Sequence, residues 1–460
     1  MNTTEAAVAR ARAAMAEFAS ASQADVDAAV TAIAWSIYKP DNAAELAHLA
    51  VEDTGLGNVD DKIVKNQRKT FGTLRDLMRA KTVGIIDDNP ETGLVRYAKP
   101  VGVVCAVTPS TNPAATPINK AMMAVKGGNA IIMAPSPSGW STTNRAIDLA
   151  RAELAKVGAP EDLMQVLPSP VTREATEELM IACDLIVATG SQNNVRKAHT
   201  SGTPAIGVGA GNVPVIIDST ADLDDAAQKV AASKTFDNAT SCSSENSLVI
   251  VDDVYDRALA ALGRAGAHRA TEDEAARINE RLFPDGHLNR RVIATDFDRV
   301  VDEFDLDVAS GTTFVMVEEP APSADRPMTG EKLSLVLTVY RAADFADAKR
   351  ITTEVLEFQG IGHSVGIHTS TDAHADELAA DLPVVRVLVN QAHTFGNGGS
   401  FDNALPFTLT MGCGTWAGNS ISENLNIEHF INITHLVRTV GEDKPTEEEL
   451  FGAHWNAVGR

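Results

Sequence analysis

The segment around Cys242 has the residue types that nucleophilic chemistry needs. Cys242 lies in the sequence DNATSCSSEN, between Ser241 and Ser243 and just before an apolar run that predicts a strand. Small polar neighbours keep a thiol accessible and offer hydrogen bonds to its thiolate. Most cysteines are inert core residues. That description fits the other three, which stand in an apolar strand, at the end of an apolar helix and between two glycines: Cys105, Cys183 and Cys413.

A second segment could stabilise a developing negative charge. The run TPSTNPAATPINK, residues 108–120, places Asn112 between Thr111 and Pro113. An amide side chain on a proline-flanked turn is a good hydrogen-bond donor to an oxyanion. An asparagine in such a place is more often only a turn residue, so both interpretations of Asn112 stay open at this point.

Two glycine-containing segments could bring backbone amides to a ligand. In ATGSQNN a predicted strand ends and a helix begins at Ser191, and free amides at a helix start can bind phosphate. In AIGVGAGNVP, residues 205–214, the glycines lie between short predicted strands and do not open a helix. This segment is therefore not the GxGxxG fingerprint of a dinucleotide fold, and its glycines indicate close approach of the backbone to a ligand or another segment.

The elements that must position these segments predict an α/β fold. Residues 1–80 are alanine-rich and helical in period, and apolar strand-length runs then alternate with helical segments. Continuous apolar strands separated by helices indicate parallel sheets covered on both faces. A second α/β region begins near Asn238, and the run FINITHLVRTV predicts a late strand followed by an acidic tail. Residues 391–425 are glycine-rich and helix-poor, and such long loops in a compact domain are usually functional.

The composition excludes several classes of function. The chain has 460 residues, of which 44% are hydrophobic, so two or three domains are expected and a disordered chain is excluded. Its formal net charge of −23 argues against nucleic acid and an anionic membrane surface as partners. No apolar run is long enough to span a bilayer and no signal-peptide pattern is present, so we expect a protein of the cytoplasm. The four cysteines include no zinc-spaced cluster, so no metal site is expected.

Taken together and in order, these segments resemble the aldehyde dehydrogenase superfamily, and within it the CoA-acylating branch. The likeness runs over almost the whole chain, in the segments PVGVVCAVTPSTNP, KGGNAIIMAPSPSG, LIVATGS, GTPAIGVGAGNVP, DNATSCSSEN, EKLSLVLTVYR, GIGHSVGIHT and GCGTWAGNSISEN. The pieces VGAGN, EKLS and GNSISEN are typical of the acylating branch. The overall run looks most like the acylating sulfoacetaldehyde dehydrogenases of that branch.

The resemblance implies a role for each matching residue. Cys242 would be the nucleophile, Asn112 would hold the oxyanion with a backbone amide, and Glu331 would bind the nicotinamide ribose. His363, in GIGHS, matches a histidine that deprotonates or places the CoA thiol, with a loop-structuring histidine as the alternative. Other residues would lie against the nicotinamide cofactor: Thr108, Pro109, Ser136, Ser138, Thr189, Gly190, Ser191 and Gly209.

One departure from the family pattern points to the acyl acceptor. Hydrolytic members carry a glutamate in an ELGGK-like motif that activates water, whereas the equivalent residues 207–212 here contain no carboxylate. A thioester at Cys242 would persist until another thiol attacks it, and coenzyme A is the natural candidate. The resemblance therefore implies interconversion of an aldehyde plus CoA with an acyl-CoA. A hydrolytic aldehyde dehydrogenase is the alternative.

The sequence defines the nicotinamide nucleotide and the aldehyde substrate less closely than the reaction type. The loop that follows residues 130–135 has no acidic residue to bind an adenosine 2′-hydroxyl. A 2′-phosphate could bind there instead, so NADP is favoured and NAD stays open; the donors would be Ser136, Ser138, Ser141 and Arg145. A sulfonate needs cationic or amide donors, and the candidates are Lys120, His393 and Asn397. Acetaldehyde, propionaldehyde and succinic semialdehyde are alternative substrates.

The resemblance also implies the architecture. A Rossmann-type cofactor domain would cover residues 1–237, an α/β catalytic domain 238–425, and an oligomerisation strand with the tail 426–460. The β segments Leu94 to Lys99 and Phe430 to Val440 match the family's oligomerisation arm, so a homodimer or homotetramer is expected. The alternative is a C-terminal strand that pairs only within its own chain.

Overall fold

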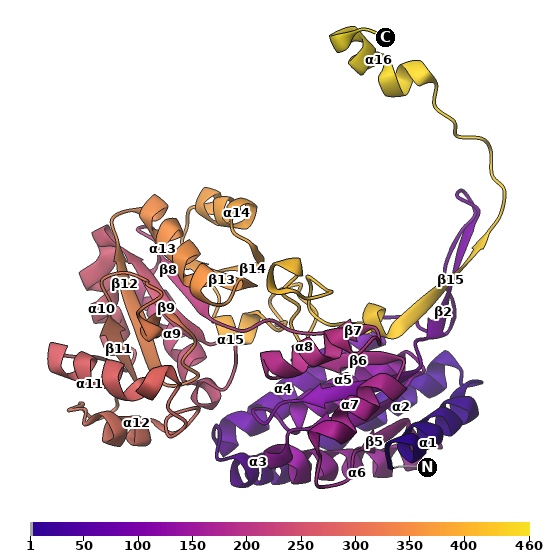
Figure 1. Ribbon diagram of the computed structural model, residues 1–460, viewed down its shortest axis with the longest axis horizontal. Coiled ribbons are helices and arrows are strands. Elements are labelled where there is room, and N and C mark those ends of the chain that lie inside the picture. The colour runs from indigo at the N-terminus through magenta and orange to yellow at the C-terminus, as the bar shows by residue number, and fades with distance from the viewer. Residues whose placement is uncertain (1–2) are drawn as a thin grey trace.

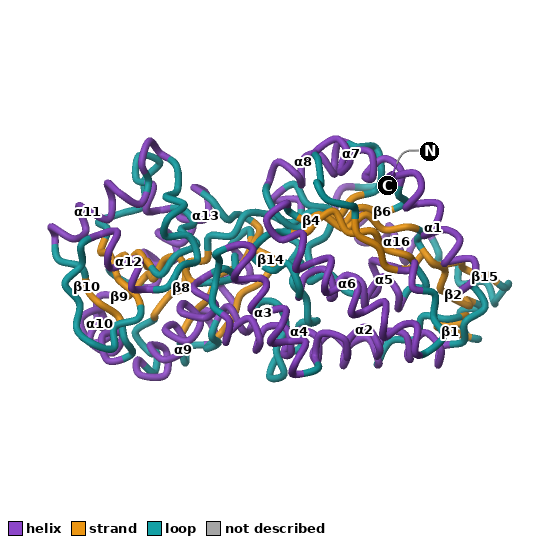
Figure 2. The backbone as a smooth tube through the Cα atoms, turned by 90° about the horizontal axis from the view of Figure 1, so that it is seen from below, coloured by secondary structure: helices purple, strands orange, loops and turns teal. Residues whose placement is uncertain are grey.

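Three sheets and the helices around them make up residues 3–460, which are the residues that the structure describes. Figure 1 shows this computed structural model, in which two α/β lobes lie side by side and a narrow arm extends from one of them. Figure 2, turned by 90°, shows the strands of each lobe enclosed by helices. The predicted α/β fold with sheets covered on both faces is confirmed.

The first lobe is a doubly wound parallel sheet with the strand order β5-β4-β3-β6-β7. Its strands are β3 (Val103–Thr108), β4 (Ala130–Pro135), β5 (Met164–Val166), β6 (Leu185–Ala188) and β7 (Ala205–Ile206). The connecting helices are α5 (Ala115–Lys126), α6 (Trp140–Lys156), α7 (Arg173–Ala182) and α8 (Gln192–Thr200). The strand order reverses between β3 and β6, and ligands of such sheets bind at the carboxyl ends of the strands at that reversal.

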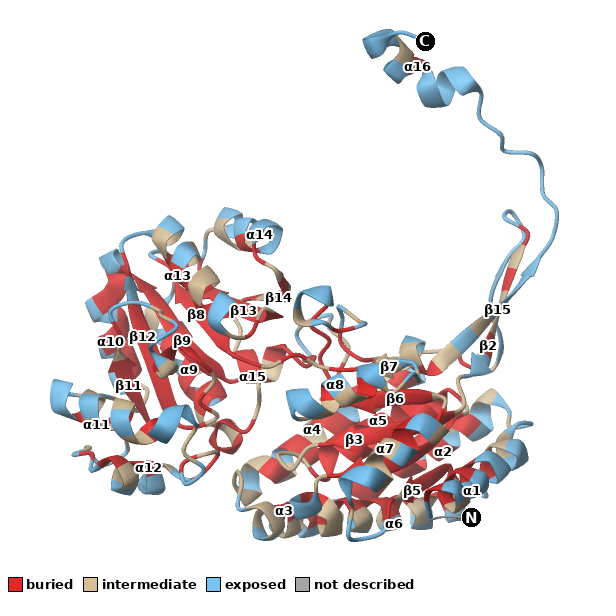
Figure 3. Ribbon diagram, in the orientation of Figure 1, coloured by how far each residue is buried: buried red, intermediate tan, exposed pale blue. Residues whose placement is uncertain are grey.

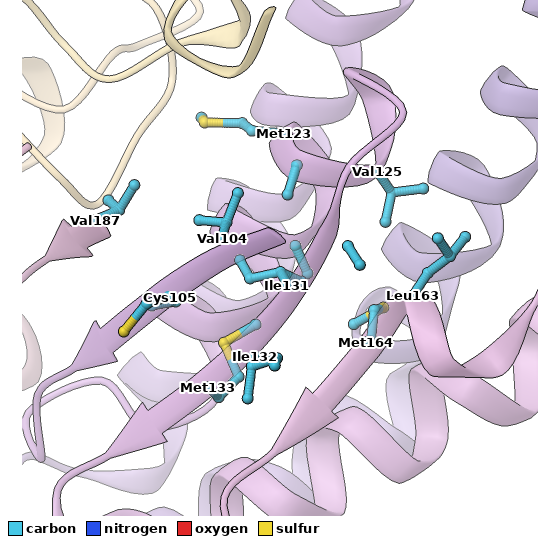
Figure 4. Packing of buried hydrophobic residues seen from close by; sticks show 14 of the residues in the cluster. Val104, Cys105, Met123, Val125, Ile131, Ile132, Met133, Leu163, Met164 and Val187 are labelled. Atoms are coloured by element: carbon cyan, nitrogen blue, oxygen red, sulfur yellow. The ribbon is translucent and has the colours of Figure 1, made fainter. Parts of the chain in front are cut away.

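Apolar side chains from β3 and β4 form the centre of the first lobe's core. Figure 4 shows Val104 and Cys105 of β3 near Ile131, Ile132 and Met133 of β4, and all five are fully buried. Strands buried on both faces need continuous apolar runs rather than alternation. Burying each large apolar side chain contributes about 1.5–3 kcal/mol to folding. Cys105 is therefore a core residue.

Four helices precede the first sheet, as the helical period of the first 80 residues predicts. They are α1 (Thr3–Phe18), α2 (Gln23–Tyr38), α3 (Pro40–Thr54) and α4 (Val59–Met78). Ser22 caps α2 in a capping box, and Pro40 opens α3. Gly55 ends α3 at a φ of 66°, a left-handed conformation that glycine adopts without strain. Asn58 then caps α4, because its side chain accepts a hydrogen bond from the backbone N–H of Asp61.

The second lobe is a seven-stranded parallel sheet with the order β10-β11-β12-β9-β8-β13-β14. Its strands are β8 (Val213–Ile217), β9 (Glu245–Val251), β10 (Ala267–Arg269), β11 (Phe314–Glu318), β12 (Val336–Ala342), β13 (Gly362–His368) and β14 (Val384–Val389). Its helices are α9 (Leu223–Thr235), α10 (Tyr255–Arg264), α11 (Glu272–Leu282), α12 (Phe297–Phe304), α13 (Phe345–Phe358) and α14 (Asp372–Asp381).

The border between the two sheets lies earlier than the expected division after residue 237. β8 pairs with β9 and β13, and α9 packs against α10. Both elements therefore belong to the second lobe, and the border falls between β7 and β8. An apolar strand pattern predicts a buried strand but does not indicate which of two sheets it joins, which explains the difference.

Residues 391–425 contain little regular structure, as expected. Their one α-helix is the single turn α15 (His393–Gly396). Hydrogen bonds hold the segment in place: Thr410 shares one with Thr189 of the first lobe at 2.8 Å, and Arg386 of β14 donates to the carbonyl oxygen of Gly412 at 2.9 Å. The segment therefore bridges the two lobes.

The arm is a third sheet, built from both halves of the chain. It consists of β1 (Gly84–Asn89), β2 (Leu94–Pro100) and β15 (Ile431–Val437), antiparallel and in that order. After β15 an extended tail leads to α16 (Glu447–Val458), a helix that the sequence analysis does not predict. Figure 3 shows that the tail and α16 are mostly exposed and lie away from both lobes. Within residues 3–460 no helix has the length and apolar character that crossing a membrane requires.

Candidate active site

The carboxyl ends of β3 and β6 open into a cleft at the strand reversal. Two adjoining cavities of about 440 Å³ and 420 Å³ share Pro109, Ser110 and residues 189–191 in their walls. The first cavity extends over the end of β4 and the start of α7. The second reaches the other lobe, where Cys242 and Glu331 lie in its wall. This is the place where a doubly wound sheet is expected to bind a dinucleotide.

Cys242 lies at the turn that leads into β9. The residue is partly buried. That burial raises the pKa of its thiol to about 12, with Glu331 and Cys413 as smaller causes. The thiol is therefore protonated at neutral pH in the free protein. Asn112 lies in the wall of the same cavity, so the fold brings together the candidate nucleophile and the candidate oxyanion donor from different lobes.

Three consecutive left-handed residues position this turn. Asp237, Asn238 and Ala239 have φ values of 50°, 53° and 59°. Asparagine and aspartate tolerate that conformation better than other residues, whereas for alanine it costs about 1–2 kcal/mol. Asp237 holds the segment in place, because its carboxylate accepts a hydrogen bond from the ammonium group of Lys62 at 3.1 Å. Strain that the surroundings enforce in this way clusters at functional sites, and here it lies three residues before Cys242.

Glu331 and Gly211 complete the wall next to Cys242. A Cβ atom on Gly211 would lie 2.6 Å from Cβ of Cys242 and 2.7 Å from Oε1 of Glu331, so only glycine fits between them. Burial raises the pKa of Glu331 to about 8, and its Oε1 is buried with no partner in the described chain. A buried carboxyl oxygen without a partner calls for a ligand group, and a ribose hydroxyl would satisfy it.

The residues predicted to contact the cofactor mostly line this cleft. Thr108, Pro109, Ser136 and residues 189–191 line the first cavity, and Gly209 lines the second. Ser138 lies outside both walls and shares a 3.3 Å hydrogen bond with Ser136. Ser191 also caps α8, so the start of that helix lies at the cleft, where its remaining backbone amides suit an anionic group. These residues and Glu331 fit a nicotinamide dinucleotide.

Two of the side chains expected to donate hydrogen bonds to a 2′-phosphate instead donate them to carboxylates of the protein. The hydroxyl of Ser141 donates to the carboxylate of Asp53, and Arg145 donates to Glu45 through two nitrogens, at 2.5 and 3.1 Å. Neither residue lines the cleft. The carboxylates come from α3, and their proximity to α6 is a tertiary contact that the loop sequence does not reveal.

His363 does not reach the cleft. It lies in β13 and is 1% exposed. Its Nδ1 shares a 2.8 Å hydrogen bond with the hydroxyl of Ser364, and burial together with Arg386 lowers its pKa well below the usual value. The structure therefore buries His363 outside the walls of the two cavities, and the role toward the CoA thiol that the resemblance implies stays a prediction. No residue of β13 is among those that line the cavity around Cys242.

The three substrate candidates also lie outside the cavity walls. Lys120 is fully buried, and its ammonium group donates to the carbonyl oxygens of Val107 and Val187 at 2.8 and 2.9 Å. It therefore ties β3 to β6. His393 is buried and bonds to the hydroxyl of Ser364 through its Nε2. Asn397 comes closer to the reacting centre, because its Nδ2 donates to the hydroxyl of Ser243 at 2.8 Å.

A third cavity contains cations that nothing in the sequence singles out. It has a volume of about 30 Å³, and its wall includes Lys65, Arg68 and Lys69 of α4. It shares Asn112 and Ser241 with the cavity around Cys242. In the sequence, these three basic residues are three and four positions apart, which puts them on one face of a predicted helix. Such a charged stripe normally marks a face exposed to solvent, so it did not indicate a cavity. We call this space the basic chamber.

Comparisons with known proteins agree with this geometry. A model of the aldehyde dehydrogenase family matches residues 2–277. An acylating sulfoacetaldehyde dehydrogenase of Cupriavidus necator is 52% identical over 457 residues, which are 99% of this chain and 93% of that protein. A protein of the same name from Bilophila wadsworthia is 44% identical, with 95% of each chain covered. The solved structure of an acetylating aldehyde dehydrogenase from Geobacillus thermoglucosidasius superposes with a TM-score of 0.92 at 34% identity, covering 96% of this chain and 98% of that chain.

Proposed function

The chain belongs to the aldehyde dehydrogenase family, and we propose that it interconverts sulfoacetaldehyde plus CoA with sulfoacetyl-CoA, using a nicotinamide cofactor. The observation that carries the acylating activity is the wall around Cys242. Among its described residues Glu331 is the one carboxylate, and residues 208–211 contribute only apolar side chains and glycine backbone. Nothing in that segment can activate water against a thioester.

The first step is addition of Cys242 to the aldehyde. The thiol loses its proton to solvent water, a bond forms between its sulfur and the carbonyl carbon, and the carbonyl oxygen becomes an oxyanion. Asn112 lies in the same cavity wall and donates a hydrogen bond to that oxygen. Preorganised donors of this kind stabilise the charge because they need not reorient during the reaction.

The second step removes two electrons from the bound aldehyde. When bound, the nicotinamide accepts a hydride from the substrate carbon. Glu331 would hold the ribose through its unpartnered Oε1, and residues 189–191 would hold the neighbouring part of the cofactor in the cleft. The oxyanion collapses to a carbonyl as the hydride leaves, so Cys242 then carries the acyl group as a thioester.

The third step transfers the acyl group to CoA. The CoA thiolate attacks the thioester carbon, the bond to the sulfur of Cys242 breaks, and the cysteine returns as a thiolate. No oxidant is needed here, because one thioester replaces another. No described histidine lines the cavity, so we assign activation of the CoA thiol to no histidine. Run backwards, the same steps reduce an acyl-CoA to an aldehyde.

We favour NADP over NAD because of the charges that line the first cavity. Arg173 and Lys197 lie in its wall with Ser136, and the carboxylate there, Glu177, pairs with Lys197. Arg173 stands at the start of α7 and is available to a 2′-phosphate. Arg173→Gln should lower the ratio of kcat/KM for NADP over NAD about tenfold, equivalent to about 1.4 kcal/mol. An unchanged ratio would contradict this assignment.

We further propose an oligomer that works in the cytoplasm. All four cysteines are free, which fits a reducing compartment. The arm has β15 at one edge with an unpaired side, and an exposed edge strand readily extends a sheet of a second copy.

A coupled assay tests the activity. Sulfoacetaldehyde, CoA and NADP⁺ are supplied together and each is then omitted, with absorbance of the reduced nicotinamide and the mass of the product as readouts. Turnover that needs all three and yields sulfoacetyl-CoA supports the proposal, and Cys242→Ala should abolish it. Formation of a free carboxylate without CoA would indicate the hydrolytic alternative.

A further inference from the structure

We propose that Lys65, Arg68 and Lys69 form a subsite for an anionic head group on the substrate. The inference deepens the proposed function and rests on it, because the head group there is the sulfonate of sulfoacetaldehyde. The reacting carbonyl lies at Cys242, and the three cations select the other end of the molecule. The ligand class is a short aldehyde, or its acyl-CoA, with an anionic group one carbon away from the carbonyl.

The basic chamber lies next to the place where the chemistry occurs. Ser241 and Ser243, which flank Cys242 in sequence, both lie in the wall of the chamber. Asn112 lies in the walls of both the chamber and the cavity around the cysteine. A carbonyl held at Cys242 and Asn112 therefore stands at the mouth of the chamber. Its volume of about 30 Å³ is room for about two water-sized groups, so it can take the oxygen atoms of a small head group but not a long chain.

One of the three cations is compensated within the protein. The ammonium group of Lys65 pairs with the carboxylate of Asp237 and also donates to the hydroxyl of Thr240 at 3.0 Å. Asp237 pairs with Lys62 as well, at 3.1 Å. The carboxylate of Asp237 is thus shared between two buried ammonium groups. It does not pair with the other two cations of the chamber.

The other two cations have no ion-pair partner among residues 3–460. Lys69 is 9% exposed, and its ammonium group donates to the carbonyl oxygen of Gly398 at 2.8 Å. Arg68 donates to the hydroxyl of Ser400 at 2.9 Å, while its Nε is buried without a partner. Asp402 is near enough to act on the pKa of Arg68, but burial has the larger effect and lowers it. Lys69 is buried and Arg68 partly buried, and burial lowers the pKa of Lys69 to about 7. Charges removed from water without a counter-ion are unfavourable, so an anion that enters with the substrate would favour the charged form of Lys69 and pair with both groups.

Aromatic rings fix the direction of the guanidinium group. Arg68 lies over the rings of Phe395, Phe401 and Phe407, at 5.5, 5.4 and 5.7 Å from their centroids. Such stacking is favourable for a guanidinium and holds it in place. A fixed planar donor can bind two oxygens of one anion at once, which suits a sulfonate with its three oxygens.

Two substitutions in the chamber, Arg68→Gln and Lys69→Met, test the proposal. Each variant is assayed for kcat/KM with sulfoacetaldehyde and with propionaldehyde, a smaller aldehyde that has an uncharged methyl group in place of the sulfonate. We expect a loss of about 10- to 100-fold with sulfoacetaldehyde, mainly in KM, the range for losing a charged hydrogen bond. The value for propionaldehyde should stay the same or rise. Arg68→Lys, which keeps the charge, should recover part of the loss.

The matched control is Arg79→Gln, which removes an exposed arginine next to the end of α4. It should change neither substrate's kcat/KM. Equal losses with both aldehydes in the chamber variants would overturn the subsite and leave the proposed function intact. Malonic semialdehyde, the carboxylate analogue, separates the two head groups: if the variants lose as much with it, the subsite recognises anions in general, as proposed, rather than sulfonates alone.

A binding measurement keeps the proposal testable if a variant folds poorly or if the function is wrong. Ethanesulfonate, which has the head group but no aldehyde, should inhibit propionaldehyde oxidation competitively in the unsubstituted enzyme. It should also give calorimetric binding heat that Arg68→Gln abolishes, while n-propanol should bind weakly to both. No detectable ethanesulfonate binding would overturn the subsite. Binding without CoA-dependent turnover of any aldehyde would instead contradict the proposed function and support the subsite.

Discussion

Cys242 and Glu331 approach each other across Gly211, and the carboxyl group of Glu331 adds to the rise in the pKa of the thiol. Burial raises the pKa of the thiol to about 12 and that of the carboxyl group to about 8. Both groups are therefore neutral at pH 7 in the free enzyme. A neutral thiol is a poor nucleophile, so the resting enzyme is expected to resist alkylation and oxidation until ligands change the electrostatics of the cleft.

Alkylation kinetics test this coupling. Glu331→Gln removes a carboxylate that opposes the thiolate of Cys242, but only above the pKa of about 8 at which it ionises. We expect iodoacetamide to modify Cys242 at similar rates in both proteins at pH 7 and faster in the variant at pH 9, as followed by mass spectrometry of the cysteine peptide. The variant Cys242→Ala lacks the thiol and therefore shows which mass-spectrometric signal comes from modified Cys242. Equal rates at pH 9 would show that the two groups do not interact.

Residue types in short motifs predicted some site residues and misplaced others. Cys242 and Asn112 were predictable, because small polar neighbours and proline-flanked turns keep a side chain at a loop surface. Lys120 was a candidate because of its charge and His363 because of the resemblance, and each belongs to a fully buried element. Whether a polar side chain points into a cavity or into the core depends on packing from distant segments, which no local motif encodes.

At the scale of elements, α4 reverses the usual amphipathic pattern. Lys62, Lys65 and Lys69 are buried, while Val64 and Phe71 are 45% and 52% exposed. Helical periodicity therefore predicts the helix, since a charged face and an apolar face both repeat every three to four residues. The periodicity would place the apolar face of α4 against the core, because apolar stripes normally face the core. In the structure the lysine face is buried instead. The strands were predictable from their apolar runs, whereas the sheet that β8 joins depends on pairing with β13, far along the chain.

The ion pairs of Asp237 connect α4 to the turn before Cys242, and their removal should destabilise the protein. Asp237→Asn leaves Lys62 and Lys65 buried without a counter-ion. Breaking a buried pair in this way costs about 3–5 kcal/mol, so the midpoint of thermal unfolding should fall markedly at pH 7. Asp376→Asn, which changes an exposed aspartate of α14, is the control and should leave it unchanged.

The pH dependence of this loss has a definite sign. Burial raises the pKa of Asp237, but Lys65 and Lys62 outweigh it, so the pKa is lowered overall. The stabilisation is therefore present above the unfolded-state pKa of about 3.9 and is lost as the pH falls through the lower folded-state pKa. The difference in unfolding midpoint between the two proteins should shrink below about pH 4. A difference that stays constant down to pH 3 would contradict the assigned ion pairs.

At the scale of the whole molecule, the outer edge of the arm and the tail expose apolar side chains. Leu436 and Val437 of β15 are 40% and 70% exposed, and Leu450, Phe451 and Val458 of α16 are similarly open. In Figure 3, β15 rises from the first lobe, and α16 lies away from both lobes. Apolar side chains gathered on a projecting element mark an interaction surface, and β15 pairs with β2 in its own chain while leaving its other side free.

We expect a homodimer or homotetramer that depends on this free edge. Light scattering coupled to size exclusion should give a multiple of the chain mass of 48.7 kDa. Leu436→Lys together with Val437→Lys places charges on the edge strand, which disfavours edge-to-edge pairing, and should shift the mass towards that of one chain. Ile181→Lys, which changes a similarly exposed apolar residue on α7, should leave the measured mass unchanged. Because the cleft lies within one chain, the dissociated variant should still oxidise the aldehyde with the nicotinamide cofactor. A protein that is monomeric without any substitution would refute the proposed assembly.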